Sequence, residues 1–478
     1  MMRSSHRLPV RSGVKVIAVV LVGLISLPVD GQETESNPTA DGPGQTLELF
    51  GLDESTLRQF TDNSPLIADE YEPIYRLLYL FPRFERVDLH RWSTPLGDGV
   101  ELVSDPAASR GEIFSLQGWV EDIQTVELPP ESVRRFNYDR FYLLRVKSSS
   151  EGGRSVIVCS REIPAAWKKP EAAGRSFAAS CLGMFVKVGT VPSDVEDPAP
   201  EELVFVTDHI AWHPFSVDEA LGVNAGKALL GQFGMDVSLF ANLEQGKPIG
   251  HSDRDCFYQL LWVMGRLDPA AIRTISHPNF QIAEWLKQPQ QQGGKFFRLK
   301  GLARRALKIR VEGTDIQEKY GLDHYYEVDM FLPLPRTLRL VDPRDQVARE
   351  YQTYPVTLCV RELPEGMPEG SSIRQEISVD ACFMKLWSYR SQFMTGEDTP
   401  EDMVRRQVSP LFVARTVTKV EPSQEKIVWP ETALVIGFFF SLGVIGISAW
   451  YYARTDRAFV DWRRRRRSQL PDEIKDLE

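Results

Sequence analysis

The chain has 478 residues, a formal net charge of −10 and an apolar fraction of 42%. These values exclude a disordered chain and a disulfide-dense miniprotein, and the length predicts two or three domains. The acidic balance argues against a nucleic-acid-binding surface, because neutralising phosphates requires clustered Lys and Arg. Such a cluster occurs only at the extreme C-terminus.

The N-terminal 31 residues have the pattern of a signal peptide. A basic, acid-free segment leads into the uncharged run Val16–Val29, which is too short to cross a bilayer comfortably. The alternative is an uncleaved N-terminal anchor. Residues 32–46 are then predicted to be a flexible linker.

An internal repeat follows. At an offset of 183 residues and without a gap, residues 47–118 match residues 230–301 at 18 of 72 positions, where ordinary composition would give roughly 4. The register slips further on and recovers at offset 200, where Cys159–Pro164 aligns with Cys359–Pro364. The sequence therefore predicts a tandem duplication: unit 1 at 47–214, a linker at 215–229 and unit 2 at 230–422.

Each unit begins with a predicted helical part. Apolar residues stand at i, i+3, i+4 and i+7 from Ile74 in one unit and from Phe257 in the other, and Pro73 suits a first helical position. A second face of each helix carries large aromatic residues, which are Tyr75 and Tyr79 in unit 1 and Tyr258 and Trp262 in unit 2. This face is predicted either to pack within its own unit or to form a partner-binding groove.

The remainder of each unit predicts five strands, of which the first is long. The expected ranges are 113–126, 141–146, 155–159, 177–191 and 203–212 in unit 1, and 296–311, 325–332, 356–360, 377–389 and 411–420 in unit 2. Unit 2 has a charged insertion at 336–354, predicted to be a loop. Five strands with a long first strand resemble the OB-fold barrel, although an SH3-like barrel or a small sandwich would give a similar pattern. The predicted fold class is α+β: two tandem copies of a helical segment plus a small five-stranded OB-like β-barrel, followed by one transmembrane helix.

The cysteines of the two units are similarly spaced. Cys159 and Cys181 are 22 residues apart, and Cys359 and Cys382 are 23 apart. The spacing suggests one disulfide in each unit, and the alternative is four buried thiols. Cys256 is then unpaired.

Both units also keep the motif Cys-x-Arg-Glu-apolar-Pro. Its charged residues, Arg161 with Glu162 and Arg361 with Glu362, are predicted either to join the barrel to the helical part or to contact a ligand twice. The motif matches no known catalytic motif.

The sequence offers little evidence for catalysis. It contains no GxSxG, HExxH, CxxC, GxGxxG or EF-hand pattern. On a strand His209 and His213 would share a face, so with Asp208 they are the weak candidates for a metal site. No catalytic residue, cofactor or firm metal site is predicted.

The C-terminal region predicts a membrane anchor. Residues 432–453 are 22 uncharged residues, about 33 Å as a helix, which matches a bilayer core. A linker at 423–431 precedes them, and a basic tail at 454–478 follows, which places the C-terminus in the cytoplasm. The block Arg463, Arg464, Arg465, Arg466 and Arg467 is a stop-transfer signal or a contact for anionic lipid. Gly437 and Ser441 could pair two such helices.

The sequence thus predicts a single-pass protein of a bacterial cytoplasmic membrane, with an extracytoplasmic ectodomain at 32–430 that carries a net charge of −14. We expect a non-catalytic binding or scaffolding protein whose partner is an envelope protein or a saccharide, without nucleic acid, and with a homodimer through the membrane helix as a further possibility. The competing hypothesis is an envelope hydrolase or metal-dependent enzyme whose site, including His209 and His213, assembles only in the fold.

Overall fold

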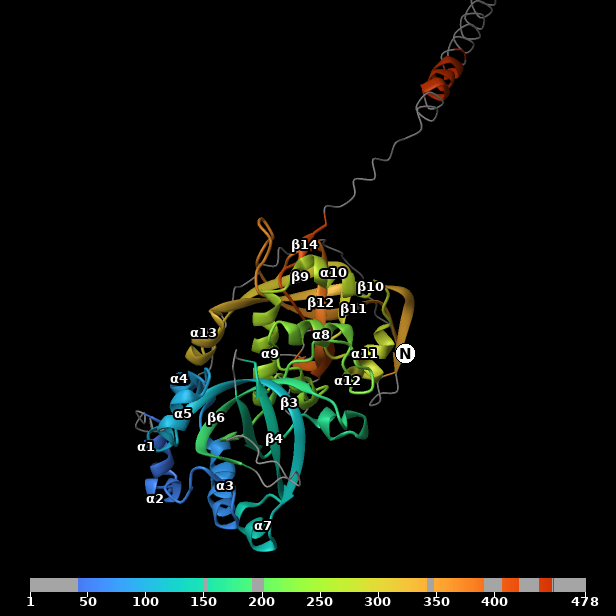
Figure 1. The fold of residues 1–478 in the computed structure, drawn as a ribbon. Coiled ribbons are helices and arrows are strands. Elements are labelled where there is room, and N and C mark those ends of the chain that lie inside the picture. The colour runs from blue at the N-terminus through green and yellow to red at the C-terminus, as the bar shows by residue number, and fades with distance from the viewer. Residues whose placement is uncertain are drawn as a thin grey trace, which may run out of the picture. The chain divides into compact units, whose positions relative to one another are not determined.

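The computed structural model describes residues 42–149, 154–190, 202–341, 348–390, 406–420, 438–448 and 450. The chain divides into two compact units, Met1–Gly222 and Val223–Glu478, here called unit 1 and unit 2. Each combines helices with a β-sheet, so the fold is mixed α+β with two sheets (Figure 1). The units are described one at a time.

Unit 1 begins with helices that cover its sheet. In the central helix α3 (Ala68–Leu80), Ile74, Leu77 and Leu78 are fully buried, as their spacing predicts. They pack against sheet residues such as Phe141 and Val204. The other helices are α1 (Pro43–Leu49), α2 (Glu54–Leu57), α4 (Arg86–Trp92), α5 (Val100–Ser104), α6 (Pro106–Ser109), α7 (Pro130–Phe136) and the 3-10 turns η1 (Phe81–Arg83), η2 (Ala165–Lys168) and η3 (Pro170–Ala172).

The sheet of unit 1 has five main strands: β3 (Ile113–Glu127), β4 (Arg140–Ser148), β5 (Ser155–Ser160), β6 (Phe177–Thr190) and β7 (Glu202–Thr207). The pairing runs β3–β4–β5–β7–β6 and returns to β3, with β5 and β7 parallel and all other neighbours antiparallel. The short strands β1 (Ser64–Pro65), β2 (Thr94–Pro95) and β8 (Ala211–Trp212) add to β6, β3 and β6.

Unit 2 has the same strand order. Its strands are β9 (Phe296–Arg310), β10 (His324–Val341), β11 (Ala348–Val360), β12 (Gln375–Arg390), β13 (Arg406–Ala414) and β14 (Thr418–Lys419). The pairing β9–β10–β11–β13–β12 returns to β9, and its one parallel pair is β11 with β13. The helices are α8 (Ala225–Gln232), η4 (Val237–Asn242), α9 (His251–Met264), α10 (Pro269–Ile275), α11 (Ile282–Lys287), α12 (Pro289–Gln292) and α13 (Thr314–Tyr320).

The minor pairings also correspond in register. Three short pairings in unit 1 have counterparts in unit 2. The pairing Ser64–Gly189 corresponds to Lys247–Trp387, and Thr94–Phe114 corresponds to His277–Phe297. The pairing Ser180–Ala211 corresponds to Ser378–Thr418. The two units therefore share the position of the helical part on the sheet as well as the strand order.

The first strand of each unit serves two neighbours, and a glycine lies where it passes from one to the other. In unit 2, β9 pairs with β12 over 296–303 and with β10 over 302–310. A Cβ on Gly301 would lie 2.4 Å from the carbonyl oxygen of Phe331, and one on Gly118 would lie 2.2 Å from that of Lys147. Only a residue without a side chain permits this close backbone approach.

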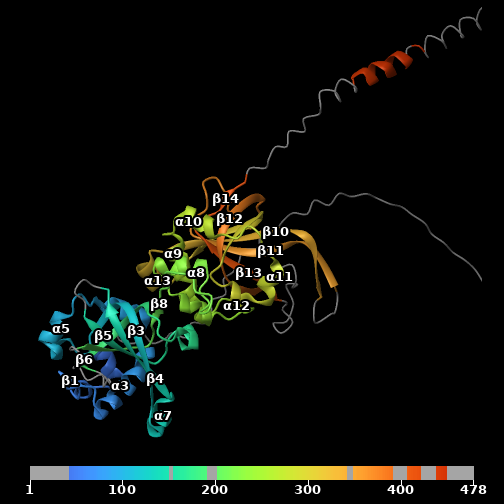
Figure 2. The ribbon, with the colours of Figure 1, turned by 45° about the vertical axis from the view of Figure 1, so that its right-hand side comes forward.

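Three expectations about segments are wrong. The charged insertion 336–354 is not a loop: β10 continues to Val341 and β11 starts at Ala348, so it extends a hairpin that projects from unit 2 (Figure 2). Helix α8 begins within the predicted linker 215–229, where the Asn224 side chain accepts a hydrogen bond from the Lys227 N–H. Helix α1 likewise begins within the predicted linker 32–46.

Helix α3 also begins earlier than expected, at Ala68, so Pro73 lies inside it. The reason is the Glu70 carboxylate, which accepts the N–H of Ile67 and thereby caps the earlier turn.

Near the C-terminus, residues 438–448 are helical and their large apolar side chains are exposed, with Phe440 73% and Ile447 69% accessible. In the part of the chain that the structure describes, no helix is both long and apolar enough to cross a membrane. The predicted signal peptide, the tail with Arg463–Arg467 and positions 432–437, 449 and 451–453 of the predicted span lie outside the described residues.

Candidate binding surface

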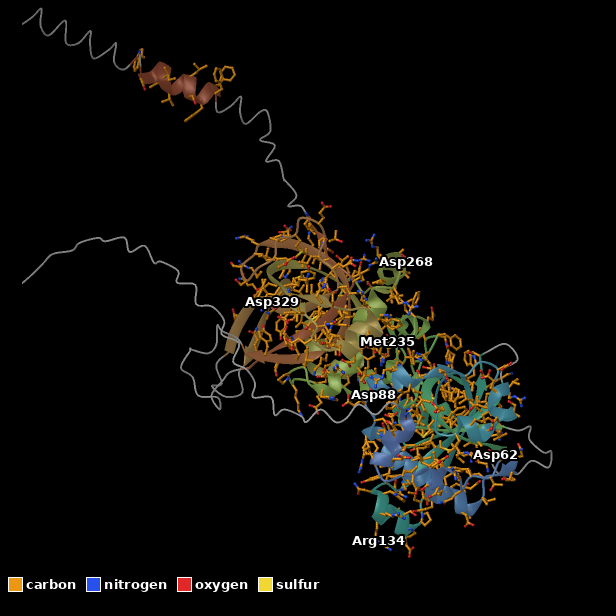
Figure 3. All side chains as sticks on the ribbon, turned by 90° about the vertical axis from the view of Figure 1, so that its left-hand side faces the viewer. Asp62, Asp88, Arg134, Met235, Asp268 and Asp329 are labelled. Atoms are coloured by element: carbon orange, nitrogen blue, oxygen red, sulfur yellow. The ribbon has the colours of Figure 1, made fainter. Side chains whose placement is uncertain are left out.

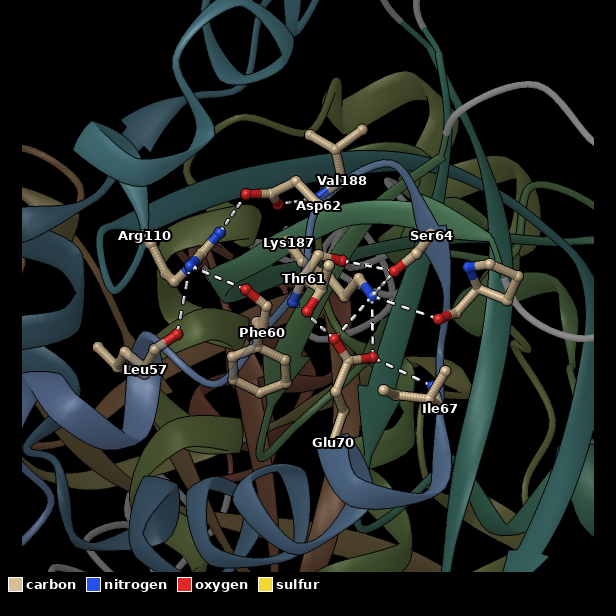
Figure 4. A network of polar contacts seen from close by, with 11 residues as sticks. Leu57, Phe60, Thr61, Asp62, Ser64, Ile67, Glu70, Arg110, Lys187 and Val188 are labelled. Atoms are coloured by element: carbon tan, nitrogen blue, oxygen red, sulfur yellow. Dashed lines mark hydrogen bonds and ion pairs between the residues drawn. The ribbon is translucent and has the colours of Figure 1, made fainter.

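A buried ion pair joins the helical part of unit 1 to its sheet. Lys187 on β6 and Glu70 on α3 are 0% and 1% accessible, and the Lys187 Nζ donates to both carboxylate oxygens at 2.9 and 2.8 Å (Figure 4). Glu70 also accepts the N–H groups of Thr61 and Ile67. Every charge is thus compensated, which is the condition under which a buried pair is tolerated.

A second charged contact lies beside it. Asp62 accepts hydrogen bonds from the Val188 N–H and from the guanidinium of Arg110, which also donates to the carbonyls of Leu57 and Phe60 (Figure 4). Together the two contacts fix the chain before α3 along the end of β6.

Unit 2 contains a counterpart of the ion pair. Lys385 on β12 donates to Asp253 on α9 at 2.7 Å, and both side chains are buried. Asp253 stands at offset 183 from Glu70 and also accepts an N–H at the start of its own helix, from Gly250. In both sheets the lysine follows a β-bulge, after Phe185 in one and after Phe383 in the other. The hydrogen bonds from Lys385 and Gly250 both reach Asp253 Oδ2, and Oδ1 is buried without a hydrogen-bond partner. We interpret this duplicated pair as structural, because its charged groups are buried and face one another.

The arginines of the duplicated motif lie near the same joint. The Arg161 guanidinium stacks over the ring of Tyr138, whose hydroxyl donates to the Tyr75 carbonyl in α3. Arg361 packs against Gly265 at the end of α9. Strands β5 and β11 end just before these arginines, and Glu162 and Glu362 are exposed. The contacts agree with the hypothesis that the arginines join the sheet to the helical part.

The predicted partner face on the two helices is partly covered within each unit. Tyr75 is buried and Tyr79 half-buried, and both contact Phe136 of α7. In unit 2, the half-buried Trp262 contacts Tyr320 of α13, and Tyr258 contacts Phe257. A helix between the first two strands of each sheet thus packs beside this face. Tyr79, Tyr258 and Trp262 stay half-buried, so a partner contact at this face remains a prediction.

The two predicted disulfides are also wrong, since all five cysteines, Cys256 included, are free thiols. Cys359 and Cys382 both pair with Val413, from opposite sides. They are therefore two strand spacings apart, about 9.5 Å, which exceeds the roughly 7 Å limit for bridged Cα atoms. In unit 1, β7 likewise separates the strands of Cys159 and Cys181. The equal spacing reflects the repeat and not a bond.

The buried thiol of Cys159 should be chemically inert in the folded protein, whereas Cys181 is half-buried. Burial raises the pKa of Cys159 to about 12 from a usual 9.0, and the pKa of Cys181 also to about 12. At pH 8 the thiolate population falls by about a thousandfold. We expect iodoacetamide to label Cys159 about a thousandfold more slowly in the native chain than in urea, measured by mass spectrometry of the peptides. Fast native labelling would contradict the buried position.

The weak metal candidates do not form a metal site. His213 exchanges a hydrogen bond of 2.8 Å with Ser180, and the Thr207 hydroxyl bonds the backbone of His209. Among the described residues, which include Asp208, no three His, Cys, Asp or Glu side chains converge as metal ligands would.

An open groove lies beside β9 in unit 2, with a volume of about 580 Å³. Its lining includes Gly301 and Leu302 of β9, Phe331 and Pro333 of β10, Thr353 of β11 and Glu376 of β12. Lys300 and Arg304 are exposed at its edge and form no ion pair with any side chain that the structure describes. The groove therefore combines apolar lining residues with the two cations Lys300 and Arg304 and one carboxylate, that of Glu376.

The neighbouring Arg305 is already occupied. It donates to Asp329 at 2.7 Å and also pairs with Glu327, both on β10; Figure 3 labels Asp329. Burial raises the pKa of Glu327, so this carboxylate needs the guanidinium beside it to stay charged. Arg305 is thus part of the scaffold beneath the groove.

Sequence reasoning missed both the buried pairs and the groove. Lys187 and Lys385 share the pattern Phe-x-Lys within apolar runs, and Glu70 aligns with Asp253 as another acid. These signals were present in the repeat, but they match no motif. The groove could have been suspected from β9, whose 15 residues include six Lys or Arg and no acid.

Comparisons with known proteins leave the chain without a family. No family model matches it, and no curated protein does. Among solved structures, a small single-stranded DNA-binding protein from Streptomyces coelicolor is 10% identical over 26% of this chain and 93% of its own, with a TM-score of 0.15. A putative aspartyl-tRNA synthetase from Leishmania major Friedlin is 12% identical over 51% of this chain and 47% of its own, with a TM-score of 0.14. Scores this low carry no argument about fold or function.

Proposed function

We propose that this chain is a non-catalytic, membrane-anchored binding or scaffolding protein, and that the groove on β9 is its binding surface. Each unit is an OB-type five-stranded barrel with a helical part, and the two arose by duplication. The closed pairing order, the glycine in the first strand and the matching minor registers support this. The ectodomain lies outside a bacterial cytoplasmic membrane, held by a span at 432–453.

The observation that carries the proposed function is the pair of available cations over an apolar groove. Lys300 and Arg304 favour a ligand that carries carboxylates over a neutral saccharide, and Leu302 and Phe331 provide apolar contact area. The ligand is an acidic polypeptide segment. The proposed extracytoplasmic location argues against nucleic acid. No contact among the described residues favours the alternative of a hydrolase.

Photo-crosslinking from the groove tests the proposal. Thr353 is replaced by p-benzoylphenylalanine in the full-length chain, and membranes are irradiated and analysed by mass spectrometry. We expect a crosslinked polypeptide that disappears when the same chain carries Lys300→Glu and Arg304→Glu, because reversing both charges repels an acidic segment.

The control places the same photoreactive residue at Lys287, which is exposed on α11 and does not line the groove. Equal crosslinking from both positions, or crosslinking that survives the charge reversal, would overturn the proposed binding surface.

A further inference from the structure

Strand β3 of unit 1 is the structural counterpart of β9. Gly118 and Gly301 occupy the same place, and the bulge residue that follows is Glu121 in β3 and Arg304 in β9. Both strands expose this residue to solvent. Residues of the two strands can therefore be compared position by position at offset 183.

The comparison shows opposite charges at equivalent positions. Three acids of β3 correspond to arginines of β9: Glu121 to Arg304, Asp122 to Arg305, and Glu127 to Arg310. Strand β3 contains no Lys or Arg. Cations of the neighbouring strand β4 lie opposite two of its acids, Arg145 opposite Asp122 and Arg140 opposite Glu127. The clearest contrast is therefore at the exposed bulge residue, which is acidic in unit 1 and basic in unit 2.

The charge difference extends over the whole units. Residues 42–222 contain 29 acids and 17 Lys or Arg, a net charge of −12, whereas residues 223–430 contain 26 acids and 27 Lys or Arg, a net charge of +1. Almost all of the acidity of the ectodomain therefore belongs to unit 1, whereas unit 2 is nearly neutral, so net charge does not make unit 2 repel an acidic partner.

The apolar groups on the two strands are complementary as well. Trp119 occupies the position of Leu302, but it is 36% accessible and contacts the ring of Phe215, which is 53% accessible. An exposed aromatic pair beside an acid in unit 1 thus matches an apolar groove beside cations in unit 2. Trp in an apolar pocket and Arg at its edge are the residue types that contribute most at interfaces.

We propose that the groove on β9 receives the surface of Trp119, Glu121 and Asp122 from a second copy of this chain. The inference rests on the proposed function and names its acidic partner. Because a unit 1 surface meets a unit 2 surface, the contact is heterologous and produces a head-to-tail series or a ring. Membrane anchoring raises the effective concentration of the two surfaces and strengthens a contact that is weak in dilute solution.

Sedimentation velocity of the full-length chain in nonionic detergent tests the proposal. We expect association at about 50 mM salt that weakens at least tenfold near 0.5 M, because exposed charges are screened over a few ångströms there. Glu121→Lys with Asp122→Lys should abolish it, and so should Lys300→Glu with Arg304→Glu. The variant with all four changes should associate again, because the signs are complementary once more.

Two further variants locate the contact. Trp119→Ala should weaken association at least tenfold even at a fixed salt concentration. Lys287→Glu, a reversal of an exposed cation on α11, should leave association unchanged.

A wild-type chain that is monomeric at low salt, or a fourfold variant that does not recover, would overturn the inference. Association that all variants retain would assign self-contact to another surface, such as the membrane helix, and would equally overturn it. A Thr353 crosslink that depends on Lys300 and Arg304 and yet captures a polypeptide other than this chain is a separate outcome. In that case the proposed function stands, and the inference that a second copy of this chain occupies the groove is wrong.

Discussion

Replacing Lys187 with Met is expected to destabilise unit 1 by about 3–5 kcal/mol, the cost of leaving one buried charge without its partner. Met preserves most of the side-chain volume, so the loss reports the charge and not a cavity. The Glu70 carboxylate would keep only the N–H groups of Thr61 and Ile67. For a unit of this size the change corresponds to a fall in melting temperature of roughly 6–20 °C, measured by calorimetry of the full chain in detergent.

A second substitution separates the charge from the contact. Glu70→Gln added to Lys187→Met removes the uncompensated charge, so the double variant should melt above the single one. Lys147→Met is the matched control, because Lys147 is exposed on β4, and its melting temperature should stay within about 2 °C of wild type. A Lys187→Met chain that melts like this control would show that the buried pair contributes nothing.

Replacing Gly301 with Ala is expected to destabilise unit 2 by about 3 kcal/mol, the upper part of the range for inserting an atom into a packed site. The added Cβ would lie 2.4 Å from the Phe331 carbonyl oxygen and 3.1 Å from the Met330 Cγ. The backbone oxygen cannot move without breaking the β9–β10 ladder. Hydrogen exchange of β9 and β10 amides, together with calorimetry, measures the loss.

Gly250→Ala is the control for this substitution. No atom lies within 4 Å of a Cβ at Gly250, its φ is −119°, and its N–H still reaches Asp253. Gly250 is the N-cap of α9, where Ala is less favourable than Gly, so this substitution should cost about 1 kcal/mol, well below the loss at Gly301. Equal effects of the two substitutions would mean that the close approach at Gly301 is not what requires a glycine.

The strands could be predicted because their local patterns are strong. The expected ranges 113–126 and 296–311 differ by one residue from β3 and β9, since alternation of buried and exposed residues is a local property of a strand. The helical spacing from Ile74 was equally informative. The start of α3 could not be predicted in this way, because it depends on Glu70. The ion-pair partner of Glu70 is Lys187, which lies 117 residues away on β6.

The residues of the proposed binding surface could be predicted only in part. A cluster of cations on β9 is visible in the sequence, but the groove also needs Thr353 from β11 and Glu376 from β12. Which side chains converge depends on pairings across the sheet. The same limit explains the disulfides: the two cysteine pairs are spaced nearly equally along the chain, whereas the strand register places Cys359 and Cys382 on either side of Val413.

The return of each strand pairing to its first strand has a consequence for how this protein can associate. Outside the projecting β10–β11 extension, whose strands pair only with one another, the main strands have neighbours on both sides and offer little template for edge-to-edge aggregation. In the closed part of each sheet, contact with other chains is then made by side chains on the outer faces. Such contacts respond to single substitutions and to ionic strength, which makes the specificity of this scaffold easy to alter without refolding it.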